Sequence, residues 1–189
     1  MALTQEALYR DLDLDLSWSE RDLPERELTK HVHRLHPYLC KFIPQLVEVV
    51  IYRYFRPGEH VLDPFAGSGT TLVQALESDL NATGIDIAAF NCLLMQVKTR
   101  RYDLFSLEHE IRSVAAALDS QAAPKQRRAS NSYLSDWYAP QALSELLSFR
   151  DAIAGREHAD VLRVVLTRAA RSARRTRHFD LEFPRAPQL

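Results

Sequence analysis

The sequence predicts an α/β fold in which a short parallel sheet packs against helices. Two short apolar segments, at 60–63 and 81–87, are each followed by apolar side chains at helical spacing. A turn of small residues at 66–69 joins the first of these segments to its helix. Strands and helices that alternate in this way build a parallel sheet with helices on its faces.

Length and composition agree with a single folded unit. The chain has 189 residues, of which 46% are hydrophobic and 26% charged, and this balance excludes a disordered or a membrane protein. No apolar run approaches the roughly 18 residues that a membrane span requires, and the first residues lack a signal-peptide pattern. We therefore expect a cytoplasmic protein without a membrane partner.

Residues 1–35 are predicted to form an N-terminal arm. Leu12, Leu14 and Leu16 alternate with aspartates, which is compatible with either a short edge strand or an extended arm. After the arm, the apolar positions take the spacing of one helical face. These positions are Leu39, Phe42, Ile43, Leu46 and Val50. The turn signal Arg56-Pro57-Gly58 should end this helix.

Residues 36–102 are predicted to hold a β-α-β-α core. The first strand, His60–Asp63, leads directly into the glycine-rich turn, and helical character begins at Thr70. The second strand is expected from Asn81 to Ile87, with Asp86 at its tip. The helix that follows should pack against the sheet through Phe90, Leu93, Leu94 and Val97.

Residues 103–189 are predicted to form a helical extension with a basic end. The first helix has Ser106 as its expected N-cap, and residues 121–132 read as a surface loop or linker. Pro140 fits the first turn of the next helix, which Gly155 should end. A last helix carries its apolar face at Leu162, Val165, Leu166 and Ala169.

The net charge of −1 conceals an accumulation of arginines near the end of the sequence. Between residues 163 and 185 only Asp180 and Glu182 oppose the basic side chains. The arginines are Arg163, Arg168, Arg171, Arg174, Arg175, Arg177 and Arg185. Such a stripe is compatible with a solvated helix face that closes salt bridges, or with a surface that contacts phosphates.

Cysteine and histidine spacing indicates no metal site. Cys40 and Cys92 lie far apart, without the spacing of a zinc site or a disulfide framework, and both are expected to be buried free thiols. His31, His33 and His36 alternate, but no carboxylate or thiol ligand follows at a familiar spacing.

The segment that carries chemistry runs from Val61 to Thr71. A turn of small residues lets the backbone approach a ligand, and the following helix directs free N–H groups toward it. Asp86, at the tip of the adjacent strand, can accept both hydroxyls of a ribose. A phosphate-binding loop of the Walker type is excluded because Thr70 follows Gly69 where a lysine is required, and Leu72 disfavours a dinucleotide fingerprint. A plain strand-to-helix turn would need neither aspartate.

These residues resemble the S-adenosylmethionine-dependent amino-methyltransferases of DNA, which make N6-methyladenine or N4-methylcytosine. Asp63-Pro64-Phe65-Ala66-Gly67-Ser68-Gly69-Thr70-Thr71 is similar to their first motif, and Gly84-Ile85-Asp86 to their second. His36-Pro37-Tyr38 with Lys41 and Pro44 resembles their tenth motif, although Lys41 falls one position later than in the commonest form. The resemblance implies a Rossmann-like S-adenosylmethionine-dependent methyltransferase fold, here with an incomplete parallel sheet and additional helices.

The resemblance also implies roles for individual residues. Phe65 and Gly67 would contact the methionine moiety, Asp86 would hold the ribose and Ile87 would pack on the adenine. Tyr38 and Lys41 would lie near the methionine carboxylate. The whole predicted cofactor site is Tyr38, Lys41, Asp63, Pro64, Phe65, Ala66, Gly67, Ser68, Gly69, Thr70, Asp86 and Ile87.

A looser resemblance to site-specific DNA methylases covers residues 84–91 and 171–180. It implies that the arginine-rich end lies close to the substrate and favours the nucleic-acid interpretation of the stripe. The predicted DNA contacts are Arg171, Arg174, Arg175 and Arg177.

No catalytic residue is predicted in this chain. The family binds the exocyclic amine of an extruded base with a D/N/S-P-P-Y/F/W loop, and the sequence contains no Pro-Pro pair. After residue 100 no strand is evident that could lie beside the Val61 strand and carry such a loop. We therefore expect only the N-terminal, cofactor-binding half of an enzyme, completed by a C-terminal half or a complementary subunit. A related RNA guanine N2-methyltransferase and a non-catalytic cofactor-binding regulatory module stay as alternatives.

Overall fold

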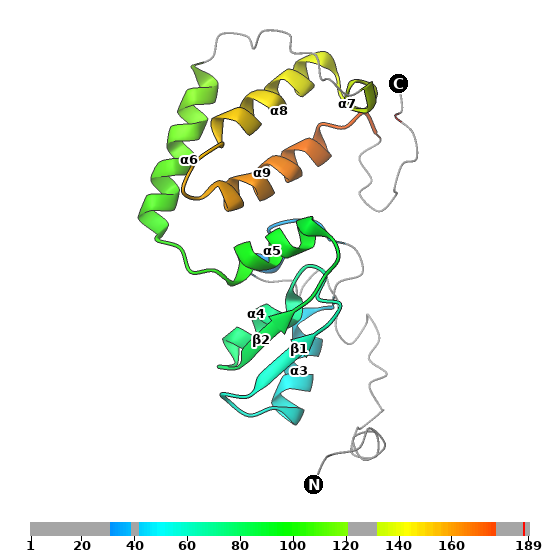
Figure 1. Cartoon of the computed structure of the whole chain (residues 1–189), viewed down its shortest axis with the longest axis vertical. Coiled ribbons are helices and arrows are strands. Elements are labelled where there is room, and N and C mark those ends of the chain that lie inside the picture. The colour runs from blue at the N-terminus through cyan, green and yellow to red at the C-terminus, as the bar shows by residue number, and fades with distance from the viewer. Residues whose placement is uncertain (1–30, 39–41, 121–131, 177–186, 188–189) are drawn as a thin grey trace.

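The computed structural model describes residues 31–38, 42–120, 132–176 and 187. The arm or edge strand expected around Leu12, most of the linker at 121–132, Cys40, Lys41 and Arg177 lie outside these residues. Figure 1 shows a lower part that holds both strands and an upper part made of helices, with α5 between them.

The lower part begins with the 3₁₀ helix η1 (His31–Arg34) and α3 (Pro44–Tyr54). The strands and helices that follow are β1 (His60–Asp63), α4 (Thr70–Glu77), β2 (Asn81–Gly84) and α5 (Ala89–Thr99). β1 and β2 are parallel, with Val61 paired to Ala82 and Asp63 paired to Gly84. The predicted β-α-β-α order is therefore confirmed in the described residues, and the carboxyl ends of the strands lie together.

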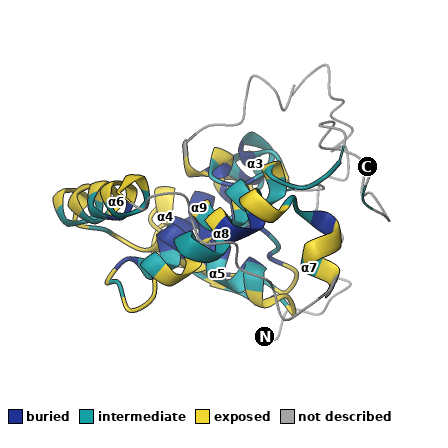
Figure 2. Ribbon diagram, turned by 90° about the horizontal axis from the view of Figure 1, so that it is seen from above, coloured by how far each residue is buried: buried dark blue, intermediate teal, exposed yellow. Residues whose placement is uncertain are grey.

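The upper part consists of four helices in the described residues. They are α6 (Leu104–Asp119), α7 (Ser132–Trp137), α8 (Pro140–Ala152) and α9 (Ala159–Ser172). Seen from above, α6 projects from the rest of the molecule, and of its residues only Val114 is buried (Figure 2). Pro140 starts α8 as expected, and Gly155, with φ of +74°, lies in the turn after it.

Three expected boundaries are wrong. The helix predicted from Leu39 starts only at Pro44, because proline disfavours helical backbone in the residue before it; Ile43 is extended. Asp103 rather than Ser106 caps α6, and its carboxylate accepts hydrogen bonds from the backbone N–H groups of Phe105 and Ser106. β2 ends at Gly84, not at Asp86, since the paired stretch of β1 ends at Asp63.

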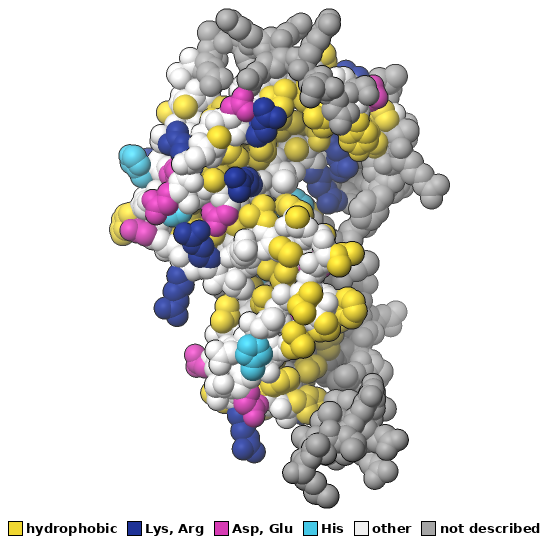
Figure 3. Space-filling view, in the orientation of Figure 1, with side chains coloured by type: hydrophobic (Ala, Val, Ile, Leu, Met, Phe, Trp, Pro, Cys, Tyr) yellow, Lys and Arg dark blue, Asp and Glu magenta, His cyan; other side chains and the backbone are white. Residues whose placement is uncertain are grey.

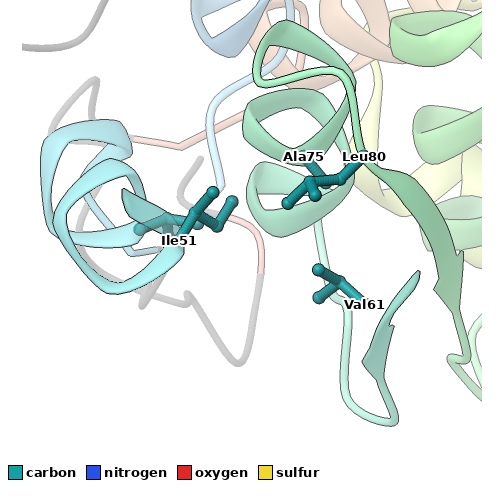
Figure 4. Packing of buried hydrophobic residues seen from close by; sticks show 5 residues of the cluster. Ile51, Val61, Ala75 and Leu80 are labelled. Atoms are coloured by element: carbon teal, nitrogen blue, oxygen red, sulfur yellow. The ribbon is translucent and has the colours of Figure 1, made fainter. Parts of the chain in front are cut away.

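One apolar core holds α3 and α4 against a face of the sheet. Figure 4 shows Ile51, Val61, Ala75 and Leu80, which contribute to this core from four different segments. Burying the larger of these side chains, Ile51, Val61 and Leu80, stabilises the fold by about 1.5–3 kcal/mol each. The core fixes the direction in which β1 delivers the chain into the glycine-rich turn.

A second core joins the two parts of the molecule. Leu94 and Val97 of α5 pack on Val161 and Val164 of α9, and both Leu94 and Val164 are fully buried. Arg168 adds a polar connection, because its guanidinium donates hydrogen bonds to the backbone oxygens of Arg34 and Leu35. The helical part is thus packed against the part that carries the sheet.

The opposite face of the sheet is open in the described part of the chain. Leu62 of β1 is 60% exposed and Ile85, just after β2, is 52% exposed. No described strand pairs with the second edge of β1. Hydrophobic side chains are accordingly visible over the strand-containing part in Figure 3. None of the described helices is long and apolar enough to cross a membrane.

Candidate cofactor-binding site

The site is built where the parallel strands end. The chain leaves β1 at Asp63, whose backbone oxygen accepts a hydrogen bond from the Ile85 N–H at 2.9 Å. Ala66 N–H donates to the Ile85 oxygen at 3.0 Å, so the turn is attached to the end of β2. The geometry leaves the backbone of 65–69 at the carboxyl edge of the sheet, where open α/β folds bind ligands.

Two glycines are required by the shape of this turn. Gly67 has φ of +50° and Gly69 has φ of +79°, a region that costs other residues roughly 1–2 kcal/mol. A Cβ at Gly67 would lie 3.1 Å from the Tyr38 hydroxyl oxygen, and one at Gly69 would lie 2.9 Å from Cγ of Met95. The turn is therefore packed from both sides, and only glycine fits.

A small pocket of about 90 Å³ lies against this turn. Among the predicted residues, the structure brings Tyr38, Asp63, Phe65, Ala66, Gly67, Ser68 and Thr70 together in its lining. Pro64, Gly69, Asp86 and Ile87 are not in the lining. Phe65 is 89% exposed and Ile87 fully exposed, so these two apolar side chains project from the surface beside the site.

Asp86 holds the turn in place. One carboxylate oxygen accepts the Gly67 N–H at 3.0 Å and the other accepts the Ala88 N–H at 2.8 Å. The Ala88 N–H above all, helped by the Asn91 amide and the Gly67 N–H, keeps the pKa of Asp86 below its ordinary value of 3.8, against a smaller desolvation effect. These three donors use three of the roughly four acceptor positions of the carboxylate, which leaves one for a ligand hydroxyl.

The hydrogen bonds that Asp86 accepts from the Gly67 and Ala88 N–H groups should weaken only at low pH. Because the folded-state pKa of Asp86 is depressed, its stabilising contribution is present above the ordinary pKa and is lost as pH falls through the lowered value. We expect the NMR-detected carboxyl titration of Asp86 to lie below that of the unfolded chain. In Asp86→Asn the Gly67 amide hydrogen should exchange faster, whereas Asp136→Asn, an exposed change on α7, should leave its exchange unaltered.

Two polar side chains of the site could be found only in the structure. Lys98 is 7% exposed, and its Nζ donates to the Ser68 backbone oxygen at 2.7 Å. The Asn91 amide donates to the Tyr38 hydroxyl at 3.1 Å. The buried residues of α5 are Asn91, Leu94, Met95, Val97 and Lys98, so an asparagine and a lysine among apolar side chains were the available signal.

Cys92 lies beside that face rather than on it. The expectation that its thiol is buried is wrong, because the side chain is half-buried, and its Sγ lies 3.4 Å from the Asp86 backbone oxygen. The described residues contain no group of three or more His, Cys, Asp or Glu side chains placed to hold a metal.

The predicted arginine stripe does not form one solvated face. Arg163 and Arg168 are exposed, but Arg168 binds the backbone at Arg34 and Leu35. Arg171 and Arg174 are half-buried and line a separate pocket. Arg175 donates its backbone N–H to the Trp137 oxygen at 2.9 Å, which attaches the end of α9 to α7.

Comparison with known proteins finds relatives of the segment that contains this turn. A family model for DNA methylases of the N6/N4 type matches residues 8–97, the segment that contains β1, β2, α4 and most of α5. This segment is therefore similar to the DNA methylase family. The resemblance of this chain to DNA methyltransferases, predicted from the motifs at 63–71 and 84–86, is thereby confirmed.

Two curated relatives of this DNA methylase segment are Type II methyltransferases. The chain is 52% identical over 104 residues to the Type II methyltransferase M.MjaII of Methanocaldococcus jannaschii, which covers 55% of this chain and 19% of the relative. It is 36% identical over 77 residues to the Type II methyltransferase M.MvaI of Kocuria varians, covering 39% and 16%. The chain thus spans less than a fifth of either relative. No solved structure matches it.

Proposed function

We propose that this DNA methylase segment is the S-adenosylmethionine-binding part of a site-specific methyltransferase that modifies adenine N6 or cytosine N4, as in restriction-modification. The observation that carries the proposal is the Gly67 turn at the carboxyl ends of two parallel strands, held by Asp86 and bordered by Tyr38. The similarity to Type II methyltransferases supports DNA as the substrate.

The residues present fit this cofactor. The hydroxyls of Ser68 and Thr70 are buried and have no hydrogen-bond partner among the described residues, so both are available to hydrogen-bond a ligand. A Cβ at Gly67 or Gly69 would crowd the turn, which is the property of a cradle that a ligand approaches closely. When bound, S-adenosylmethionine supplies an electrophilic methyl group on a sulfonium.

Each residue of the chain would have a definite task. Asp86 keeps the Gly67 N–H in place and accepts a ribose hydroxyl with its remaining lone pair. Phe65 and Ile87, which are exposed, would cover the methionine and adenine moieties and exclude water. Lys98 restrains the turn through the Ser68 oxygen. We propose that Lys41 pairs with the methionine carboxylate, and that Arg171, Arg174, Arg175 and Arg177 contact DNA phosphates.

The acceptor of the base amine would come from elsewhere. Because the sequence has no Pro-Pro pair, we propose that a D/N/S-P-P-Y/F/W loop is supplied by a C-terminal half or a complementary subunit. The open edge of β1 and the exposed Leu62 and Ile85 offer this second part a place to extend the sheet.

Substitution of two glycines tests the cofactor assignment. Gly67→Ala and Gly58→Ala both place an alanine at positive φ, and each should lose roughly 1–2 kcal/mol of stability. Only at Gly67 does the new Cβ meet the Tyr38 hydroxyl, since nothing lies within 4 Å of one at Gly58. By calorimetry, Gly67→Ala should weaken S-adenosylmethionine binding by about tenfold or more, a difference of about 1.4 kcal/mol. Equal affinities of the two folded variants would contradict the assignment.

A further inference from the structure

A second pocket, of about 330 Å³, lies apart from the cofactor turn. It is enclosed by the segment before α3, the first turn of α5, the end of α7 and the last turns of α9. Its lining includes His36, Phe90, Tyr138, Thr167, Arg171 and Arg174, none of which lines the cofactor pocket.

The described residues make the lining of this pocket positively charged. Among the described lining residues are two guanidinium groups and no carboxylate. Arg174 is positioned by an antiparallel bridge to Tyr138, and the N–H of Arg175 donates to the Trp137 oxygen. The guanidinium of Arg174 makes only a 3.4 Å contact from Nε to the Arg171 oxygen within the described residues, so its other N–H groups can reach a ligand.

Tyr138 provides a neutral donor next to these arginines. Its hydroxyl has no hydrogen-bond partner in the part of the chain that the structure describes. Burial raises the pKa of Tyr138, although Arg174 opposes the shift, so the phenol keeps its proton at neutral pH. A hydroxyl donor in the same lining as two guanidinium groups suits an anion with several oxygens.

His36 lines the pocket and is 8% exposed. Its Nδ1 lies 2.8 Å from the Pro37 oxygen, to which it can donate, and its ring meets Phe90 edge-on at 4.9 Å. Burial above all lowers the pKa of His36, and the charges of Arg171, Arg168 and Lys98 lower it further against the Pro37 hydrogen bond. An anion in the pocket would oppose those charges and favour the imidazolium.

We infer that this pocket binds one phosphodiester of the DNA backbone, with Arg171 and Arg174 pairing its oxygens and Tyr138 donating a hydrogen bond. The inference rests on the proposed function and adds a defined subsite to it. Phe90 lies four residues after Asp86 and His36 two residues before Tyr38, so the phosphate would be held by the same two segments that border the cofactor turn. A bound strand would thereby be placed in register with the methyl donor.

Inorganic phosphate tests the pocket by itself. In the intact chain, the NMR-detected pKa of His36 should rise when phosphate replaces chloride at constant ionic strength. The rise should disappear in Arg174→Gln and persist in Arg163→Gln, which removes an exposed arginine of α9 outside the pocket. Circular dichroism establishes that each variant is folded. A His36 pKa that is the same in both salts would overturn the inference.

A short DNA duplex tests the source of the phosphate. Arg174→Gln should weaken duplex binding by about tenfold and reduce the salt-dependence slope by about one. Tyr138→Phe should weaken binding less, with an unchanged slope. Arg112→Gln, which removes an exposed arginine that pairs with Glu108 on α6, should leave both quantities unaltered.

The phosphate experiment and the duplex experiment test the pocket separately from the proposed function. A phosphate response of His36 with equal duplex affinities of Arg174→Gln and Arg112→Gln would overturn DNA as the ligand in favour of free phosphate or an acidic peptide. Calorimetry with S-adenosylmethionine is independent of both of these experiments. A chain that binds no S-adenosylmethionine would contradict the proposed function. The phosphate and duplex results could still support the pocket in that case.

Discussion

On its own, the chain should transfer no detectable methyl group to DNA. Under the proposed function the turn at Gly67 and the Asp86 carboxylate would serve the cofactor, whereas the sequence has no Pro-Pro pair to accept hydrogen bonds from the base amine. Positioned acceptors and donors in an active site each contribute roughly 10²–10⁴-fold to the rate. Any transfer by the chain alone should therefore be at least about a thousandfold slower than that of the complete enzyme, and so below detection.

Complementation is the measurement that checks this expectation. Radiolabelled methyl transfer to duplex DNA should appear when the chain is mixed or fused with a polypeptide that carries the Pro-Pro loop. The same mixture made with the Gly67→Ala variant should stay well below it, and that made with Gly58→Ala should not. Efficient methylation by the homogeneous chain alone would mean that a residue within it accepts the amine.

Leu94→Ala should destabilise the fold more than either glycine substitution. Leu94 is fully buried between α5 and α9, and removing a buried leucine side chain costs about 2–5 kcal/mol. This is a large part of the roughly 5–15 kcal/mol that stabilises a typical domain. Urea unfolding should show the loss as a lower midpoint. The control, Leu104→Ala on α6, removes a side chain that is 72% exposed and should change the midpoint little.

The result would also show how the two parts depend on each other. A single unfolding transition of Leu94→Ala, shifted as a whole, is expected if α9 and the sheet unfold together. Two separate transitions, with only the helical part destabilised, would contradict the view that the core around Leu94 joins them.

Local patterns were sufficient to predict most of the regular structure. The helices from Thr70 and Pro140 and the parallel strands follow from apolar periodicity and from turn residues. Periodicity did not reveal α7, a helix of six residues that is attached through the Tyr138 bridge to Arg174. It also gave the wrong cap for α6, because Ser106 and Asp103 both suit that position and only the actual start of the helix selects between them.

The site could be predicted only in part for a similar reason. Motif spacing identifies the residues of the turn, and the structure gathers seven of the twelve predicted positions in one pocket. Spacing does not show that a side chain predicted to bind a ligand also accepts hydrogen bonds from the backbone. Asp86 was expected to serve the ligand, whereas in the structure both its oxygens already accept backbone N–H groups. The contacts of Lys98 and Asn91 join segments 30 and 53 residues apart, which no local pattern encodes.

The hydrogen bonds from Arg168 to the backbone of Arg34 and Leu35 have a consequence for biosynthesis. They span 134 and 133 residues. At about 5–20 residues per second, a ribosome needs on the order of ten seconds to add the intervening chain. During that interval the strands and α4 can already form, and the segment leading to Tyr38 can make its hydrogen bond between His33 and Gln74 but not yet those from Arg168. The segment that borders the Gly67 turn is thus fully attached only after the turn itself can form. A nascent chain that stalls before α9 would lack this attachment.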